Sequence, residues 1–472
     1  MDIAAEKLEI CLEVLQQIAD DPESIASHDR LKGLIAKIHK QGRKYSRKHD
    51  RTERKIEERQ TRENTELVRL QHPELNRNLL PIARYPAHSQ QSISCYICKE
   101  AYQKVHSFYH LLCPKCAEFN YQKRSQRADL TGRVALITGG RIKIGYQLGL
   151  RLLQDGARVI ITTRFPQDSA RRYSLEPDFN EWRDRLQIHG LDLRDLKSLE
   201  GFIEYLLARE SALDIVINNA CQTVKRPLEF YKHLLAQEEL SGAVKALIPV
   251  DGDVQTALLE TRSNYRLELL HSNQMYFPAQ TFDRDGQQLD LRPINSWALK
   301  LDAVSTPELL EVQLINAIAP FLLNSKLKPL LMRSRFNRRF IINVSAMEGQ
   351  FNRQHKTTAH PHTNMAKAAL NMMTRTSGAD YAEDNIFMNS VDTGWITNEN
   401  PYPKSQRMEK EQDFYPPLDV IDGMARIYDP IVTGINSPEI PLFGHFLKDY
   451  FPYPWSSIVF NLIVGEGAIR FG

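Results

Sequence analysis

Four of the six cysteines in this chain of 472 residues occur as two closely spaced pairs. Cys95 and Cys98 form the first pair, and Cys113 and Cys116 form the second, with two residues between the members of each pair. A turn of this kind directs two thiolates the same way, and two turns together complete the tetrahedron that Zn²⁺ prefers. Because four protein ligands leave no open position on the metal, the pattern predicts a structural zinc site within residues 94–127.

A lysine is the second candidate for chemistry. The stretch HPHTNMAKAAL, residues 360–370, predicts a helix that presents Lys367 one turn after Thr363. The stretch RRFIINVSA predicts a buried strand that ends near Ser345, and a predicted helix before it contains Asn316. An ammonium, two hydroxyls and an amide can orient or protonate a substrate, so their function depends on the elements that carry them.

Strands and helices alternate from residue 134 onward. Apolar runs at 134–139, 158–164, 186–195 and 213–220 predict buried strands, and helical stretches separate them. The same alternation returns toward the C-terminal end of the chain. This order predicts an α/β fold with a Rossmann-like, doubly wound parallel sheet and helices on both faces. Residues 222–305 break the alternation, and we expect them to form an inserted cap.

The turn after the first predicted strand reads TGGRIKIG, residues 138–145, and lies where such a fold places the phosphates of a dinucleotide. This turn is followed in the chain by Asp192, by INNA ending at Ala220, and by Asn316, Ser345 and Lys367. Residues 130–472 resemble the short-chain dehydrogenase/reductase superfamily in the order of these motifs. The resemblance implies an oxidoreductase that acts on a carbonyl or alcohol, with a substrate that the sequence does not identify.

The resemblance also implies a role for each matching position. Asn316 would hold a proton-relay water, Ser345 would orient the substrate carbonyl, and Lys367 would bind the nicotinamide ribose. The remaining implied cofactor-binding positions are Thr138, Gly139, Ile144, Gly145, Asp192, Asn219, Ala220, Gly394, Ile396 and Thr397. The chain departs from the family at Asp392 and Thr393, where proline is common.

The family's acid, a tyrosine four residues before the lysine, is replaced here by Thr363. A threonine hydroxyl donates a hydrogen bond but does not ionise near neutral pH. Three interpretations remain open. His362 or the neighbouring His360 supplies the proton; the substrate takes its proton from water while Thr363 only orients it; or the fold binds NADP(H) without turnover and acts as a regulator or scaffold.

Charge favours one cofactor over the other. An acid after the second strand would accept hydrogen bonds from both ribose hydroxyls, but this chain has Arg164 there. A guanidinium suits a 2′-phosphate, and Arg141 and Lys143 in the turn add positive charge. We therefore expect NADP(H) in preference to NAD(H).

Four segments are expected along the chain: a helical region (1–71), a linker (72–93), the four-cysteine module (94–127), which resembles a treble-clef zinc finger, and the reductase-like domain (128–472). The net charge of +3 and the acids within the basic stretch 40–69 disfavour nucleic acid as a partner. The N-terminus lacks the pattern of a secretory signal, and no apolar stretch is long enough to predict a membrane span. We therefore expect an intracellular, cytoplasmic protein. A protein partner at the zinc module or the N-terminal helices, and a homo-oligomer, stay open.

Overall fold

The computed structural model describes residues 4–72, 88–240, 250–251, 274–283, 285–353, 356–412 and 414–455. The chain divides into two compact units. The first contains residues 1–93 and 101–110, and the second contains residues 94–100 and 111–472. The two cysteine pairs therefore belong to the second unit, although the residues between them belong partly to the first.

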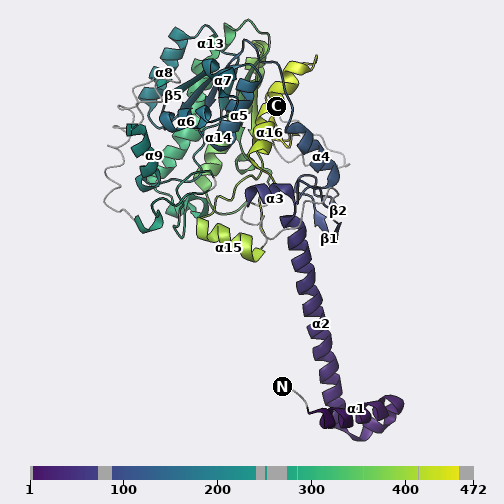
Figure 1. The fold of residues 1–472 in the computed structure, drawn as a ribbon. Coiled ribbons are helices and arrows are strands. Elements are labelled where there is room, and N and C mark those ends of the chain that lie inside the picture. The colour runs from purple at the N-terminus through teal and green to yellow at the C-terminus, as the bar shows by residue number, and fades with distance from the viewer. Residues whose placement is uncertain are drawn as a thin grey trace, which may run out of the picture. The chain divides into compact units, whose positions relative to one another are not determined.

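The first unit is mainly helical. Its elements are α1 (Ala5–Asp20), η1 (Pro22–Ser27), α2 (Asp29–Glu63), α3 (Glu66–Gln71), β1 (His88–Ser94) and β2 (Ala101–Lys104). α2 is one continuous helix of 35 residues (Figure 1), and its charged sequence leaves almost every residue exposed. Leu67 and Val68 on α3 are fully buried, and the Leu67 amide donates to the carbonyl of Phe108.

Part of the predicted linker forms a strand of the first unit. β1 begins at His88, inside the range 72–93 that the sequence assigned to a linker, and β1 pairs with β2. Residues 73–87 of that range lie outside the described part of the chain.

A sheet of nine strands forms the centre of the second unit, counted over the described residues. Its order is β11-β10-β9-β8-β6-β3-β4-β5-β7, and only β11 runs antiparallel to its neighbour. The strands are β3 (Val134–Thr138), β4 (Arg158–Thr163), β5 (Leu186–Gly190), β6 (Ile215–Asn218), β7 (Val250–Asp251), β8 (Arg339–Ser345), β9 (Ile386–Asp392), β10 (Phe446–Lys448) and β11 (Phe451–Tyr453). The central strands are apolar without alternation because both faces of a parallel sheet are covered.

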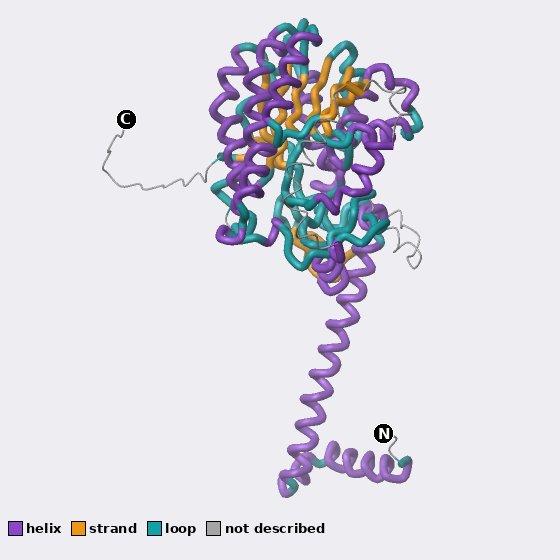
Figure 2. Tube along the Cα trace, turned by 90° about the vertical axis from the view of Figure 1, so that its left-hand side faces the viewer, coloured by secondary structure: helices purple, strands orange, loops and turns teal. Residues whose placement is uncertain are grey.

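Two layers of helices cover the sheet (Figures 1 and 2). One apolar cluster joins the sheet to α5 (Lys143–Gln154), α6 (Pro166–Ser174), α7 (Phe179–Trp182) and α16 (Val420–Asn436). The other joins it to α8 (Leu196–Arg209), α12 (Ala319–Lys326), α13 (Lys328–Met332) and α14 (Pro361–Glu383). The predicted doubly wound α/β fold is confirmed.

Side-chain caps fix several helix starts. Asp195 accepts hydrogen bonds from the amides of Lys197 and Ser198 at the start of α8. Asp419 and Asp422 form a capping box at the start of α16. Such caps satisfy amides that have no partner inside the helix, and each typically contributes about 1 kcal/mol.

The range 222–305 interrupts the alternation of strands and helices, as expected. Its described part holds α9 (Leu228–Leu240), β7 and three short 3₁₀ turns, η6 (Gln274–Tyr276), η7 (Ser296–Ala298) and η8 (Leu301–Ala303). Residues 241–249, 252–273 and 284 of this range lie outside the description. β7 pairs with β5 and extends the central sheet, so the inserted segment contributes a strand to the sheet.

The second unit contains six further short elements among its described residues. They are α4 (Pro114–Lys123), η3 (Arg183–Arg185), α11 (Thr306–Gln313), the π-helical turn η9 (Leu314–Ile318), η10 (Met347–Gly349) and α15 (Tyr402–Gln412). Over the described residues, no helix has both the length and the apolar character that crossing a membrane requires.

Candidate active site

A cavity of about 1290 Å³ opens at the carboxyl ends of the parallel strands. This is the edge where doubly wound sheets bind their ligands. Most of the residues predicted from the sequence line it: Gly139, Arg141, Lys143, Ile144, Gly145, Arg164, Asp192, Asn219, Ala220, Ser345, Thr363, Lys367, Gly394, Ile396 and Thr397. Thr138, Asn316 and His362 do not line it.

The turn after β3 is tied to the end of β6. The Thr138 hydroxyl accepts hydrogen bonds from the amides of Asn219 and Ala220, at 3.1 and 3.0 Å. The Asn219 side chain donates to the carbonyls of Thr138 and Gly139, each at 3.1 Å. Thr138 thus acts behind the cavity wall, because it holds the two chain segments that form the wall.

Two glycines in this turn cannot carry a side chain. Gly139 has φ +72°, and a Cβ there would approach the Cα of Ala220 to 2.9 Å. A Cβ on Gly145 would lie 2.3 Å from the carbonyl oxygen of Gly139. The backbone therefore packs closely here, as it does where a turn must bring its amides to a phosphate.

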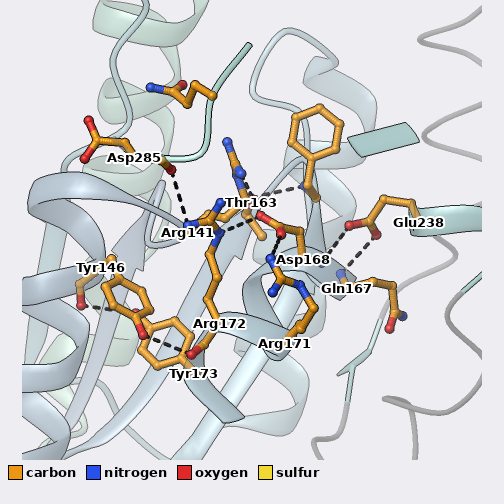
Figure 3. A network of polar contacts seen from close by, with 12 residues as sticks. Arg141, Tyr146, Thr163, Gln167, Asp168, Arg171, Arg172, Tyr173, Glu238 and Asp285 are labelled. Atoms are coloured by element: carbon orange, nitrogen blue, oxygen red, sulfur yellow. Dashed lines mark hydrogen bonds and ion pairs between the residues drawn. The ribbon is translucent and has the colours of Figure 1, made fainter. Parts of the chain in front are cut away.

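Arg141 does not present a free charge to the cavity. Its guanidinium is buried and donates to Asp168 on α6 at 2.7 Å (Figure 3). Arg171 and Arg172 donate to the same carboxylate, each at 2.8 Å. Burial opposes ionisation of Asp168, but hydrogen bonds from Arg172 and Arg141 outweigh it and lower the pKa of Asp168 to about 2.

The same network joins the cap to α6. The carboxylate of Glu238 on α9 accepts hydrogen bonds from the amides of Gln167 and Asp168 at the start of α6, at 3.0 and 2.9 Å (Figure 3). Burial raises the pKa of Glu238 to about 7. Lys143 in the turn lies 3.7 Å from the carboxylate of Asp285, also in the inserted segment.

Arg164 lines the cavity directly after β4. Its guanidinium donates to the phenol oxygen of Tyr231 on α9 at 3.0 Å and lies 4.7 Å from that ring's centre. Asp192 accepts hydrogen bonds from Arg194 on both of its oxygens. Burial opposes the charge of Asp192, yet Arg194 and then Arg164 lower the pKa of its carboxyl. The charges at this part of the cavity are thus arranged around one arginine after β4 and one carboxylate after β5.

Ser345 and Lys367 come from adjacent elements, β8 and α14. The Ser345 hydroxyl donates to the side-chain oxygen of Asn371 at 2.6 Å, and the Lys367 ammonium donates to the carbonyl of Val344 at 2.8 Å. Thr363 lies one turn before Lys367 and is buried, and its hydroxyl has no hydrogen-bond partner among the described residues. The structure therefore brings Ser345, Thr363 and Lys367 together on one wall of the cavity.

The two histidines before α14 differ in their surroundings. His362 is 1% exposed and its Nε2 lies 3.4 Å from Glu308 on α11, away from the cavity lining. His360 lines the cavity and stacks on Trp297, with ring centres 3.9 Å apart. Its Nδ1 lies 2.9 Å from the Trp297 carbonyl, which can only accept, so Nδ1 carries the proton there. Burial lowers the pKa of His360, which disfavours the doubly protonated ring that a proton donor needs.

Asn316 supports the site from behind. It lies in the π-helical turn η9, and its side chain makes a pair of hydrogen bonds with the backbone of Gln222, at 2.8 and 3.0 Å. Gln222 itself lines the cavity, two residues after Ala220. π-turns inside helices are frequent at functional sites, and here the turn fixes the chain that follows β6.

Two residues that line the cavity were not predicted from the sequence as site residues. Asp392 ends β9, pairs in register with Ser345 of β8, and accepts a hydrogen bond from the Met347 amide at 3.2 Å. Burial, with Asp449 nearby, raises the pKa of Asp392 to about 6. Tyr96, between the first two cysteines, lines the same cavity. Asp392 was noted only as a departure from a motif, and Tyr96 carried no sequence signal beyond its place between ligands.

The four cysteines form one cluster in the second unit. Their sulfur atoms all lie within 4.8 Å of one another, and those of Cys98 and Cys113 are 3.7 Å apart. A tetrahedral zinc with Zn–S bonds of about 2.3 Å places its sulfurs about 3.8 Å apart. Burial opposes ionisation of Cys95, but amides of Cys113, Cys98 and Ile97 donate to its sulfur and lower the pKa of the thiol. The donor set and its spacing fit Zn²⁺.

Comparison with known proteins agrees with this geometry. The family model described as short chain dehydrogenase matches residues 133–258, and the model described as Enoyl-(Acyl carrier protein) reductase matches residues 297–418. A protein of Acanthamoeba polyphaga mimivirus, named Uncharacterized protein R665, is 33% identical over 353 residues, 71% of each chain. Retinol dehydrogenase 12 of Bos taurus is 34% identical over 136 residues, which span 27% of this chain and only 42% of that enzyme.

Among solved structures, the NADPH-bound carbonyl reductase from chicken fatty liver is 20% identical, with a TM-score of 0.42. That likeness covers 68% of this chain and 97% of the reductase. On these two family models, whose matched ranges contain strands β3 to β9, this chain belongs to the short-chain dehydrogenase/reductase superfamily, whose members are oxidoreductases.

Proposed function

We propose that the protein is an NADP(H)-dependent reductase or dehydrogenase that acts on a carbonyl or the corresponding alcohol. The observation that carries the proposal is one cavity lined by Ser345, Lys367 and Arg164. Its volume, about 1290 Å³, exceeds the usual range of roughly 300–1,000 Å³ for a single small ligand, which leaves room for a dinucleotide and a substrate.

The reaction divides between the cofactor and the protein. The nicotinamide, when bound, supplies or accepts the hydride. Ser345 donates a hydrogen bond to the substrate oxygen once a substrate competes with Asn371 for its proton. Lys367 holds the nicotinamide ribose and places positive charge beside the developing alkoxide. Thr363 orients the substrate with its hydroxyl, which no described residue engages, and does not act as the acid.

The proton comes from a non-standard donor. His362 faces Glu308 away from the cavity lining, and burial disfavours the charged form of His360. The carboxyl of Asp392 lines the cavity beside Ser345 and keeps its proton up to a pH of about 6. We assign proton delivery to Asp392 or to water that it contacts, in place of either histidine.

Arg164 favours NADP(H) over NAD(H). It follows β4 and lines the cavity, at the position where an acid would otherwise bind both ribose hydroxyls. Its contact with Tyr231 fixes the guanidinium beside the cavity. Arg141 contributes through Asp168 by holding the phosphate turn, and not as a phosphate ligand. The four cysteines would hold a structural Zn²⁺.

A second candidate function is a cofactor-binding regulator without turnover, with a protein partner at the cysteine module or the N-terminal helices. The absence of a tyrosine at position 363 favours it. The segment after Ser345 argues against a simple plug, because Asn352, Arg353 and Lys356 line the cavity and leave its volume open.

The test measures NADPH oxidation against a panel of aromatic aldehydes, cyclic ketones and enones. Wild type should turn over at least one class, and Lys367→Ala should lower kcat/KM about 100-fold or more, a loss of about 3 kcal/mol of transition-state stabilisation. Lys326→Ala, an exposed lysine on α12, is the matched control. In His362→Ala the pH dependence of kcat/KM should match that of wild type, because His362 is not the proton donor.

Binding separates the two functions and tests the cofactor. By calorimetry, Arg164→Ala should weaken NADPH binding about 10- to 100-fold, as expected for the loss of a charged hydrogen bond, and leave NADH binding unchanged. Turnover that ignores Lys367 would remove the reductase proposal. Tight NADPH binding with no turnover on the panel would favour the regulator.

A further inference from the structure

The first cysteine pair contributes to the wall of the cavity. Tyr96, Ile97 and Lys99, which lie in or directly after the Cys95–Cys98 turn, all line the cavity that Ser345 and Lys367 line. A structural zinc module normally stabilises its own small fold. Here its turn is part of the surface that a substrate would meet.

The turn has a defined conformation. The amides of Cys95 and Tyr96 donate to the carbonyls of Glu100 and Leu111, at 2.9 and 2.8 Å, and Lys99 has φ +65°. The Lys99 ammonium donates to the Tyr96 carbonyl at 2.5 Å. These contacts fix the backbone that carries the Tyr96 side chain.

Buried polar contacts hold the module against α16. Arg124, directly after α4, donates to both Asp419 and Asp422 of the capping box, at 2.7 and 2.9 Å. Arg426, which is 2% exposed, donates to Asn120 on α4 at 3.0 Å. Breaking a buried, hydrogen-bonded charge pair is costly. The module is therefore fixed to the domain that contains the cavity.

The Tyr96 phenol reaches the loop after β9. Its oxygen accepts a hydrogen bond from the Trp395 amide at 3.0 Å, and a Cβ on Gly394 would lie 3.6 Å from it. This loop continues from Asp392, the register partner of Ser345. The phenol therefore lies beside the end of the sheet where Ser345 ends its strand. Because the oxygen accepts from Trp395, its own proton is available to an acceptor in the cavity.

We infer that Tyr96 is a substrate-contacting residue, that its phenol donates a hydrogen bond to the substrate oxygen, and that metal at the four cysteines holds it in place. Its ring, with Trp297 and Trp395 in the same lining, favours a cyclic or aromatic carbonyl compound. This inference rests on the proposed function and adds a site residue from outside the matched family segments, which begin at residue 133.

The experiment uses the chain of residues 1–472 with 4-nitrobenzaldehyde and propanal as probe carbonyls. Tyr96→Phe removes only the hydroxyl, and Tyr96→Ala also removes the ring. Tyr121→Phe is the matched control, because Tyr121 is an exposed tyrosine on α4 that does not line the cavity. Steady-state kinetics with NADPH are measured together with NADPH affinity and with the affinity of each probe for the NADP⁺ complex, which needs no turnover.

Tyr96→Phe should raise KM or lower kcat for both probes about tenfold, with NADPH affinity within twofold of wild type. Tyr96→Ala should cost a further tenfold for 4-nitrobenzaldehyde but not for propanal. Zinc removal with a chelator should reproduce the loss of probe affinity and speed deuterium exchange at the Trp395 amide, while Tyr121→Phe behaves as wild type.

The outcomes are separable. Wild-type affinity for 4-nitrobenzaldehyde in both Tyr96 variants would overturn the inference, whether or not turnover occurs. Probe binding that depends on Tyr96 without NADPH oxidation would support the inference and contradict the reductase proposal. Unchanged Trp395 exchange and unchanged probe affinity after complete zinc removal would overturn the role of the metal.

Discussion

At the scale of single residues, Asp392 is a carboxylate at a position where the family commonly has proline. It ends β9 inside the cavity, where burial and the carboxylate of Asp449 both disfavour its charge. Its pKa is raised from 3.8 to about 6, so the folded protein binds its proton more tightly than the unfolded chain does. The stability that protonation provides is therefore present below pH about 4 and is lost as the pH rises through about 6.

Asp392→Asn should remove the loss of stability that accompanies ionisation of Asp392. A shift of about two pKa units corresponds to about 3 kcal/mol, so the variant should gain about 1–3 kcal/mol of unfolding free energy at pH 7.5 and little at pH 4. Urea unfolding at both pH values measures it, with the exposed Asp184→Asn as a control. An equal effect of Asp392→Asn at the two pH values would contradict the shift.

Several residue assignments could be predicted from the sequence, and others could not. Gly139 and Gly145 follow from the tight turn that the motif demands. Arg141 was predicted to add positive charge at the cofactor turn. The sequence could not show that Asp168, 27 residues away, is its counter-ion, because only the βα packing brings the two together. His362 was predicted as a possible proton donor because spacing cannot tell which side of a helix start faces Glu308. Tertiary contacts decided both.

At the scale of elements, α6 depends on one buried carboxylate. Asp168 joins the phosphate turn through Arg141 to its own helix through Arg171 and Arg172 (Figure 3). Because the pKa of Asp168 is lowered to about 2, its stabilisation is present above pH about 4 and is lost as the pH falls toward 2.

Asp168→Asn should destabilise the protein by about 3–5 kcal/mol at pH 7, because three arginines lose a buried partner. NADPH affinity should fall too, since Arg141 no longer fixes the turn. Thermal unfolding and calorimetry measure the two effects. Asp380→Asn, which removes an exposed partner of Lys328, should change stability by less than about 1 kcal/mol. A stability change below that of the control would refute the role of the network.

The elements themselves were the most predictable part of the structure. Apolar runs such as β3 and β8 are typical of buried strands. Their strict alternation with helices is compatible with few sheet topologies. The inserted range 222–305 was recognised only as a break, because its polar sequence lacks one period. That it would add β7 to the sheet depends on pairing with β5, which no local pattern encodes.

At the scale of the whole molecule, the four cysteines are separated in sequence but meet in one cluster. Cys113→Ser should lower the zinc content of the purified protein from about one per chain to well below that, because a tetrahedral thiolate site loses a ligand. The midpoint of thermal unfolding should fall as well. Cys221→Ser, an exposed cysteine outside the cluster, is the control and should keep its metal. Full zinc occupancy in Cys113→Ser would exclude this site.

The contact of the cysteine module with α16 has a consequence for how the reductase can be shortened. The matched family segment begins at residue 133, and a chain cut there would keep all nine strands of the described sheet. It would also lose Tyr96, the Arg124 partner of Asp419 and the Asn120 partner of Arg426, and so expose one side of the cavity to solvent. Homology-guided truncation would then keep the nucleotide-binding turn and remove part of the cavity wall that a substrate would meet. A module that looks detachable in sequence therefore forms part of the cavity of its neighbouring domain.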